Sequence, residues 1–232
     1  IPSEVTGELV LNLDAVNPYS YESGSSGTTW TDVSGQNNDG TLTNGAFYEN
    51  GSISFDGTND YVSTGNFSLD FGTGSFTLSA WIKTPNNTQQ GKVINKGQSG
   101  AFPLGSKGYS LRFYDRALFA VTDGTTSVSL ATATINDIPN DTWKHFVGVV
   151  NRSSSLQSIY IDGNINNSAS ISYGSISNPD AELTIGNLDR GTYGPDAEFF
   201  DGNISNVKIY NRALSTSEIT QNYNATKGRF GL

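Results

Sequence analysis

Alternation of apolar and polar residues along many short segments is the feature that most constrains how this chain can fold. In the stretch 76–83, apolar side chains stand at every second position from Phe76 to Ile82, and the residues between them, such as Thr77 and Ser79, would point to the opposite side. A period of two residues is typical of a β-strand with one face in the core. Comparable segments span Leu9–Leu13, Ile53–Phe55, Tyr109–Tyr114, Ala117–Val121, Trp143–Val150, Ser158–Ile161, Leu183–Gly186 and Ile204–Tyr210. So many short strands favour an all-β sandwich of two antiparallel sheets.

Asp-Gly pairs separate several of these segments. They stand at Asp39-Gly40, Asp56-Gly57, Asp123-Gly124, Asp162-Gly163 and Asp201-Gly202. An Asp-Gly pair accepts the positive φ angles of a type I′ turn, which joins two neighbouring antiparallel strands. The clearest case is Asp162-Gly163, because it directly follows the alternating segment Ser158–Ile161. The pairs therefore predict hairpin turns.

One short helix is expected near the C-terminus. Ser215 and Glu218 have capping-box spacing, and Ile219 and Tyr223 follow on one face of that helix. No change in composition of the kind that marks a linker divides the 232 residues. We therefore expect a single domain over residues 1–232.

The charge of the chain restricts its partners. The formal net charge is −9 at pH 7, and such a surface repels phosphate backbones and anionic membranes. Neither nucleic acid nor a membrane is therefore expected as a partner. The chain has no cysteine, so it forms neither disulfides nor thiolate metal sites. It begins with Ile1 and has no methionine, which suggests a processed product or a piece of a longer protein.

Five phrases of the sequence, taken in order, resemble a known family. They are Trp30–Gly35, Phe55–Val62, Phe76–Lys83, Trp143–Gly163 and Gly202–Ser215. Together they look like the laminin-G-like domains of the concanavalin A-like lectin/glucanase superfamily. The resemblance implies a two-sheet antiparallel jelly-roll sandwich with one short C-terminal helix. It does not specify function, because this fold hosts lectins, hydrolases, adhesion modules and scaffolding domains.

A finer likeness concerns the two ends of the chain. The segments Leu11–Ala15, Ser20-Tyr21, Asn222–Ala225 and Gly228–Leu232 are similar to lectin-like modules of tailed-phage structural proteins. This likeness implies a location on a virion surface, or an extracellular one, and a neighbouring virion or surface protein as partner. Assembly into a homo-oligomer stays open.

Catalysis is not expected. The hydrolases of this fold carry a Glu-x-Asp-x-x-Glu strand, which would place three carboxyl groups on one face, and this chain has no such motif. The single histidine, His145, lies in an apolar strand with no acid near it in sequence, which favours a packed histidine over a catalytic base. No catalytic residue is therefore assigned, and a diverged glycan hydrolase is the least favoured interpretation.

The resemblance also implies a structural Ca²⁺ ion. Calcium takes six to eight oxygen ligands, and the family often holds one between segments that correspond to Asp56, Asp60 and Asp201. Where the family often has an acid, however, this chain has Ser205. The alternative is that the aspartates only form turns.

Aromatic and planar polar side chains could form a carbohydrate-binding surface. Trp81 alternates with the apolar positions of its strand, and Arg112 and Tyr114 alternate with those of theirs. The loop residues Asp189, Arg190 and Tyr193 offer a second cluster. The alternatives are that Trp81 packs beneath a neighbouring segment and that the loop is an ordinary solvated turn.

These observations favour a non-catalytic glycan-recognition or adhesion module on the surface of a larger assembly, such as a phage particle. The alternative is a purely structural decoration or assembly domain that contacts neighbouring proteins. A glycan array separates these two functions.

Overall fold

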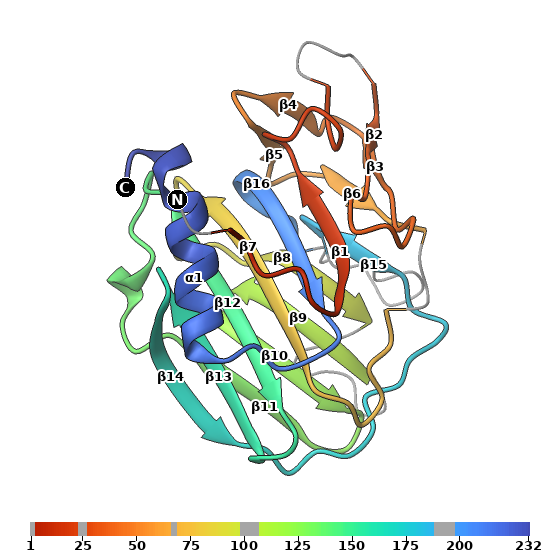
Figure 1. Cartoon of the computed structure of the whole chain (residues 1–232), viewed down its shortest axis with the longest axis vertical. Coiled ribbons are helices and arrows are strands. Elements are labelled where there is room, and N and C mark those ends of the chain that lie inside the picture. The colour runs from red at the N-terminus through yellow and green to blue at the C-terminus, as the bar shows by residue number, and fades with distance from the viewer. Residues whose placement is uncertain (1–2, 23–26, 66–68, 98–106, 188–197) are drawn as a thin grey trace.

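Two antiparallel sheets make up the fold, as the alternation predicts (Figure 1). The computed structural model describes residues 3–22, 27–65, 69–97, 107–187 and 198–232. Sheet A is an eight-stranded sheet in the order β14-β13-β12-β7-β16-β5-β4, with β1 paired to β16. Its strands are β1 (Leu9–Asp14), β4 (Phe47–Glu49), β5 (Ser52–Asp56), β7 (Phe76–Lys83), β12 (Lys144–Asn151), β13 (Leu156–Ile161), β14 (Asn164–Ser170) and β16 (Asp201–Tyr210).

Sheet B is also eight-stranded, in the order β11-β10-β9-β8-β15-β6-β3-β2. Its strands are β2 (Thr29–Trp30), β3 (Gly40–Thr43), β6 (Tyr61–Ser63), β8 (Gly91–Gly97), β9 (Lys107–Phe113), β10 (Ala117–Asp123), β11 (Ser127–Ala131) and β15 (Leu183–Ile185). A short 3-10 helix, η1 (Ile135–Asp137), precedes β12. The architecture is the all-β jelly-roll sandwich that the sequence predicts.

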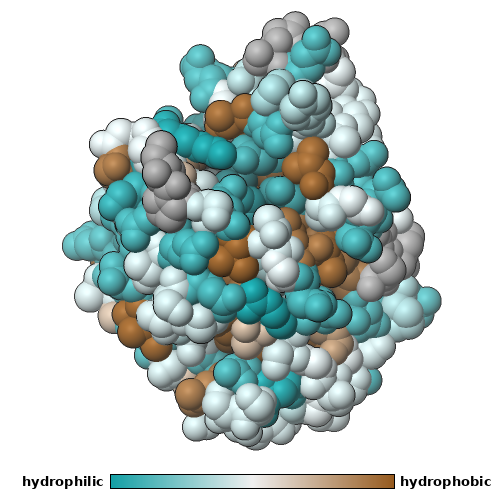
Figure 2. Space-filling view, in the orientation of Figure 1, coloured by the Kyte–Doolittle hydropathy of each residue, from teal (hydrophilic) through white to brown (hydrophobic). Residues whose placement is uncertain are grey.

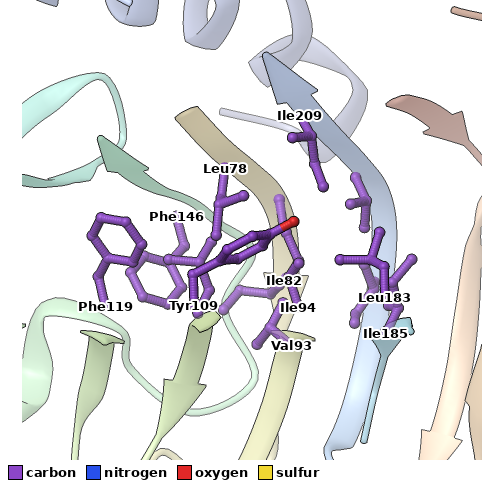
Figure 3. Close-up of a cluster of buried hydrophobic side chains, with 14 of the residues drawn as sticks. Leu78, Ile82, Val93, Ile94, Tyr109, Phe119, Phe146, Leu183, Ile185 and Ile209 are labelled. Atoms are coloured by element: carbon purple, nitrogen blue, oxygen red, sulfur yellow. The ribbon is translucent and has the colours of Figure 1, made fainter. Parts of the chain in front are cut away.

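The hydrophobic core fills the space between the sheets (Figure 3). Leu78 and Phe146 project into it from sheet A, and Tyr109, Phe119 and Leu183 project from sheet B. The buried hydroxyl group of Tyr109 donates a hydrogen bond to the carbonyl oxygen of Leu69 over 2.8 Å. Since alternate residues of each strand enter this layer, their neighbours occupy the two outer faces.

The first and last strands lie side by side. β1 pairs antiparallel with β16 from Leu9 opposite Tyr210 to Asp14 opposite Asn206. Leu11 and Leu13 are fully buried. β1 and β16 therefore both belong to sheet A.

The Asp-Gly pairs differ in their roles. Asp162 and Gly163 have φ angles of 52° and 78° in the turn between β13 and β14, as a type I′ turn requires. Gly40 and Gly202, in contrast, lie within strands β3 and β16, so the prediction of turns at Asp39-Gly40 and Asp201-Gly202 is wrong. A Cβ atom at Gly202 would lie 2.3 Å from the carbonyl oxygen of Lys83, so this glycine allows β16 to approach β7 closely.

The expected C-terminal helix is α1 (Thr216–Thr226), which continues into a 3-10 helix, η2 (Lys227–Phe230). The Glu218 carboxylate accepts a hydrogen bond from the amide of Ser215 over 2.9 Å, and the Ser215 side chain caps the helix in return. α1 lies across the outer face of sheet A (Figure 1). Beneath and around it is a second apolar cluster, made of Val147, Val149, Tyr160, Tyr210, Leu214 and Ile219.

The face that carries α1 is mostly hydrophilic or neutral at its surface, with hydrophobic residues in small patches (Figure 2). Within the described ranges, no helix is long and apolar enough to cross a membrane. Tyr223 of α1 stacks on Trp81 and His145 of sheet A, so this helix covers part of the sheet's outer face.

Candidate functional site

A cluster of charged residues lies on the outer face of sheet B. Lys92 of β8 and Arg112 of β9 are cross-strand neighbours, and Arg112 points outward because Leu111 and Phe113 enter the core. Both cations lie beside one carboxylate: an oxygen of Glu198 is 2.9 Å from Nζ of Lys92 and 3.7 Å from Nη1 of Arg112. Lys92 and Arg112 are 1% and 8% exposed. Burial lowers the pKa of Arg112, and the Glu198 carboxylate opposes that shift.

Tyr114 stands at the rim of this cluster. Its amide donates to the carbonyl oxygen of Arg116 over 2.9 Å, and Asp115 between them has a φ of 62°. The tight turn leaves the Tyr114 side chain 47% exposed. The guanidinium carbon of Arg112 lies 5.9 Å from the centre of the Tyr114 ring. Arg112 and Tyr114, which the sequence analysis assigns to one surface, thus lie together.

The loop residues predicted to bind sugar, Asp189, Arg190 and Tyr193, lie outside the described residues. Gly186 and Glu198, which lie on either side of this loop in the chain, are both hydrogen-bonded to β8. The amide of Gly186 donates to the carbonyl oxygen of Val93 over 3.2 Å, and that of Lys92 donates to the carbonyl oxygen of Glu198 over 3.2 Å. The charged cluster therefore adjoins both flanks of segment 188–197.

The structure corrects the placement of Trp81. Its side chain lies on the outer face of sheet A, but only 1% of it is exposed because α1 and η2 cover it. Its indole Nε1 donates to the hydroxyl of Thr226 over 2.9 Å. Its ring stacks on Phe230 with 4.2 Å between the ring centres. Trp81 therefore anchors the C-terminal segment, is not an open platform, and lies on the other sheet from Tyr114.

The three aspartates expected to bind calcium have different surroundings. Asp56 and Asp201 are cross-strand neighbours of β5 and β16, and burial, followed by the negative charge of Asp56, raises the pKa of Asp201. Asp60 uses both carboxylate oxygens on backbone amides, that of Gly45 over 2.7 Å and that of Asp56 over 3.1 Å. Asp56 accepts from the amide of Thr58 over 2.8 Å. These hydrogen bonds fit turn-forming roles for Asp56 and Asp60.

Metal centres of other kinds are also absent from the described residues. Across the part of the chain that the structure describes, no group of three or more His, Cys, Asp or Glu residues could hold a metal ion. The imidazole of His145 is 3% exposed and lies on sheet A beneath α1. It agrees with the expectation of a packed histidine.

Comparison with known families decides where this fold belongs. The family described as "Concanavalin A-like lectin/glucanases superfamily" matches residues 56–220, more than half of the chain. The chain belongs to this superfamily. The matched region of this concanavalin A-like domain extends from Asp56 to Thr220 and so includes the charged cluster, Tyr114 and most of both sheets. A comparison with curated proteins finds no match.

Solved structures show the same sandwich. Domain 4 of AbnA, a GH43 extracellular arabinanase from Geobacillus stearothermophilus, solved with arabinotriose, is 17% identical with a TM-score of 0.69, over 93% of this chain and 98% of that domain. The binding domain of Paraclostridial Mosquitocidal Protein 1 is 18% identical with a TM-score of 0.68, over 95% of this chain and 52% of that one. The receptor binding domain of botulinum neurotoxin D is 15% identical with a TM-score of 0.68, over 95% and 53%. This concanavalin A-like domain therefore spans about half the length of the toxin domains it matches.

Proposed function

We propose that this domain recognises a glycan without cleaving it, on the outer face of sheet B around Tyr114 and Arg112. The observation that carries the proposal is an exposed aromatic ring beside a guanidinium that Glu198 holds in place. An aromatic ring can pack against the apolar face of a sugar, and a fixed planar donor can bind its hydroxyl groups. Because Glu198 fixes the guanidinium before binding, little side-chain entropy is lost when a ligand arrives.

The similar structures support this proposal. One is an arabinanase domain in complex with arabinotriose, and two are binding domains of toxins. At 15–18% identity they share the fold with this chain, and the bound arabinotriose of the first and the binding-domain names of the other two favour recognition. The absence of a Glu-x-Asp-x-x-Glu motif from the sequence agrees with a binding role.

Replacing Tyr114 with alanine tests the proposed surface. The oligosaccharide would first be identified on a glycan array, and its affinity then measured by calorimetry. We expect Tyr114→Ala to weaken binding at least ~10-fold, a loss of about 1.4 kcal/mol, because the stacking ring is removed. Incubation with the bound oligosaccharide should release no reducing sugar.

Tyr19→Ala is the matched control. Tyr19 is 85% exposed and lies in the turn after β1, so its loss should leave affinity and stability unchanged. An array without any bound glycan contradicts the proposal and favours the structural decoration domain. If Tyr114→Ala and Tyr19→Ala lost affinity equally, the binding surface would not be centred on Tyr114.

We also propose that the domain is displayed on the surface of a larger assembly, such as a phage virion. This proposal rests on the sequence likeness of the chain ends to lectin-like modules of phage structural proteins. Cross-linking in the native particle would identify the neighbouring proteins. Contacts with structural proteins of a virion are the expected result, and recovery of the domain free of any assembly would contradict it.

We also propose a calcium site between Asp56 and Asp201. Because burial and the negative charge of Asp56 raise the cost of ionising Asp201, a cation between the two carboxylates would relieve their repulsion. A site with a Kd near 10⁻⁵ M would add about 2.7 kcal/mol of stability at 1 mM Ca²⁺, which corresponds to roughly 5–10 °C in Tm. Melting curves with calcium and with EDTA measure this difference.

Asp201→Asn should abolish the gain in Tm from calcium, because the amide keeps the shape but not the charge. Asp123→Asn serves as a control, since Asp123 lies in the turn after β10 and accepts hydrogen bonds from Thr125 and Thr126. Its calcium response should equal that of the wild type. Identical wild-type melting with calcium and with EDTA would show that these aspartates only form turns.

A further inference from the structure

His145 occupies an enclosed position between sheet A and the C-terminal helix. Its Nε2 lies 2.8 Å from the hydroxyl oxygen of Ser79 on the adjacent strand. Its ring centre is 5.3 Å from that of Trp81 and 6.2 Å from that of Tyr223 on α1. The second ring nitrogen, Nδ1, is buried and has no hydrogen-bond partner among the described residues. A neutral imidazole fits this position, whereas an imidazolium would carry a second N–H with no acceptor.

Two lysines of sheet A lie near His145: Lys144 precedes it on β12, and Lys208 lies on β16, the strand beyond β7. Lys208 forms an ion pair with Glu4 of the N-terminal segment, and Lys144 lies 2.5 Å from a carboxylate oxygen of Asp162. The other Asp162 oxygen accepts from the backbone amide of His145 over 3.1 Å. Both carboxylates are thus directed at other groups, and the positive charge of Lys208 adds to the cost of charging the ring.

The C-terminal helices place one more cation near His145. No described carboxylate of these helices contacts the imidazole ring. Lys227, at the end of α1, lies 5.2 Å from the centre of the Tyr223 ring, and Tyr223 is the α1 residue that stacks on His145. On β7, Lys83 lies over Trp143, 5.5 Å from its ring centre. Among the described residues, no charged group therefore lies where it would stabilise the protonated ring, because the Asp162 carboxylate is bound to Lys144 and to the backbone amide of His145.

We propose that His145 is an acid-sensitive latch, and that its protonation releases α1 and the N-terminal segment from sheet A. A charge on the ring would be desolvated, would lack an acceptor for Nδ1–H and would face Lys208. The way to hydrate it is to lift the cover, which consists of α1, η2 and residues 3–8. Burial, followed by the charge of Lys208, lowers the pKa of His145 from its usual 6.5 to about 3.

The cover packs on the second apolar cluster and is also held by polar contacts, all of which lie outside the main core. Asn222 of α1 accepts from the amide of Val5 over 2.8 Å, and Gln221 donates to the carbonyl oxygen of Ser3 over 2.6 Å. Arg229 lies 2.7 Å from a carboxylate oxygen of Asp14. The latch goes beyond glycan recognition, because it concerns sheet A and not the Tyr114 surface on sheet B.

The pKa of His145 differs between the closed and the open state of the cover, and this difference determines how the opening equilibrium depends on pH. The closed state has the lower pKa, so it binds fewer protons than the open state, in which the imidazole is hydrated. The closed state is therefore fully favoured above about pH 6.5 and loses stability as the pH falls towards 3. Over this window the equilibrium constant for opening should rise about 10-fold per pH unit.

Hydrogen exchange of the whole chain, corrected for intrinsic exchange rates, tests the latch. Between pH 6.5 and 4.5 we expect opening of residues 216–230 to increase about 50-fold, while β9 and β10 stay protected. In His145→Gln, which keeps a neutral polar side chain, the increase should fall below about 3-fold. Glu4→Gln and Asp14→Asn each remove one ion pair between the cover and sheet A, and should retain the wild-type slope.

The same pH slope in His145→Gln would overturn the latch, because the carboxylates would then account for it. Equal loss of protection in β9 and β10 would also overturn it, since the domain would then unfold as one unit. Should the variant fail to fold, the wild type still gives an answer. His145 is the single histidine of the chain, so one imidazole NMR signal reports its titration, and a native pKa near 6.5 contradicts the latch.

Discussion

Replacing Trp81 with alanine is expected to lower the free energy of unfolding by about 3–5 kcal/mol. Only 1% of the side chain is exposed, and its removal leaves a cavity between sheet A and the C-terminal segment. The variant also loses the stacking on Phe230 and leaves the Thr226 hydroxyl without its donor. For a domain of this size Tm should fall by roughly 6–20 °C, as thermal unfolding followed by circular dichroism would measure.

Tyr114→Ala provides the matching control. Its side chain is 47% exposed, and surface substitutions of this kind change stability within about 0.5 kcal/mol. The two variants should therefore behave in opposite ways: Trp81→Ala melts early, and Tyr114→Ala melts normally but loses glycan. If Trp81→Ala instead melted like the wild type but no longer bound glycan, Trp81 would be part of the sugar-binding surface.

Deleting residues 1–14 is expected to leave the chain largely unfolded at 25 °C. The deletion removes β1 with the fully buried Leu11 and Leu13, and each lost leucine costs about 2–5 kcal/mol. It also removes the Glu4 partner of Lys208 and frees one edge of β16. The sum is comparable with the whole stability of a typical domain, about 5–15 kcal/mol. Urea denaturation and near-ultraviolet circular dichroism would show the loss.

Val16→Ala is the control for this deletion. Val16 follows β1 directly and is 43% exposed, so truncating it should change stability by no more than about 0.5 kcal/mol. Wild-type melting of the deleted chain would mean that β16 holds its place without β1. That result would contradict a structural role for the first strand.

Sequence alternation predicted the strands well, because each strand needs only its own residues to show which side is apolar. Leu9–Leu13 and Phe76–Lys83 lie in strands as expected, and the capping residues Ser215 and Glu218 start the helix. Alternation cannot show what covers an outer face. Trp81 was therefore assigned correctly to the side opposite the core, yet the ring is buried because a helix 145 residues further along the chain packs on it.

The candidate site was predictable only in part. Arg112 and Tyr114 are two residues apart in one strand and its turn, so their common surface follows from the period of two. Lys92 and Glu198 could not be predicted as site residues from the sequence. Their meeting with Arg112 depends on the pairing of β8 with β9 and on a chain segment far away in sequence. The bulge between Lys92 and Ile94 also breaks the alternation of β8. Nothing local to either residue indicates that they meet.

The placement of the two chain ends has a consequence for how the domain would work when tethered. Ser3 bonds to Gln221 of α1, and both ends lie on the helix-covered side of the sandwich (Figure 1). Any polypeptide joined to either end would leave from that layer, while Tyr114 belongs to the other sheet. If a support were attached at these chain ends, the Tyr114 ring would face away from the support. Several copies anchored in this way would present parallel surfaces, so that weak single contacts with a repetitive polysaccharide would add up to strong adhesion through effective concentration.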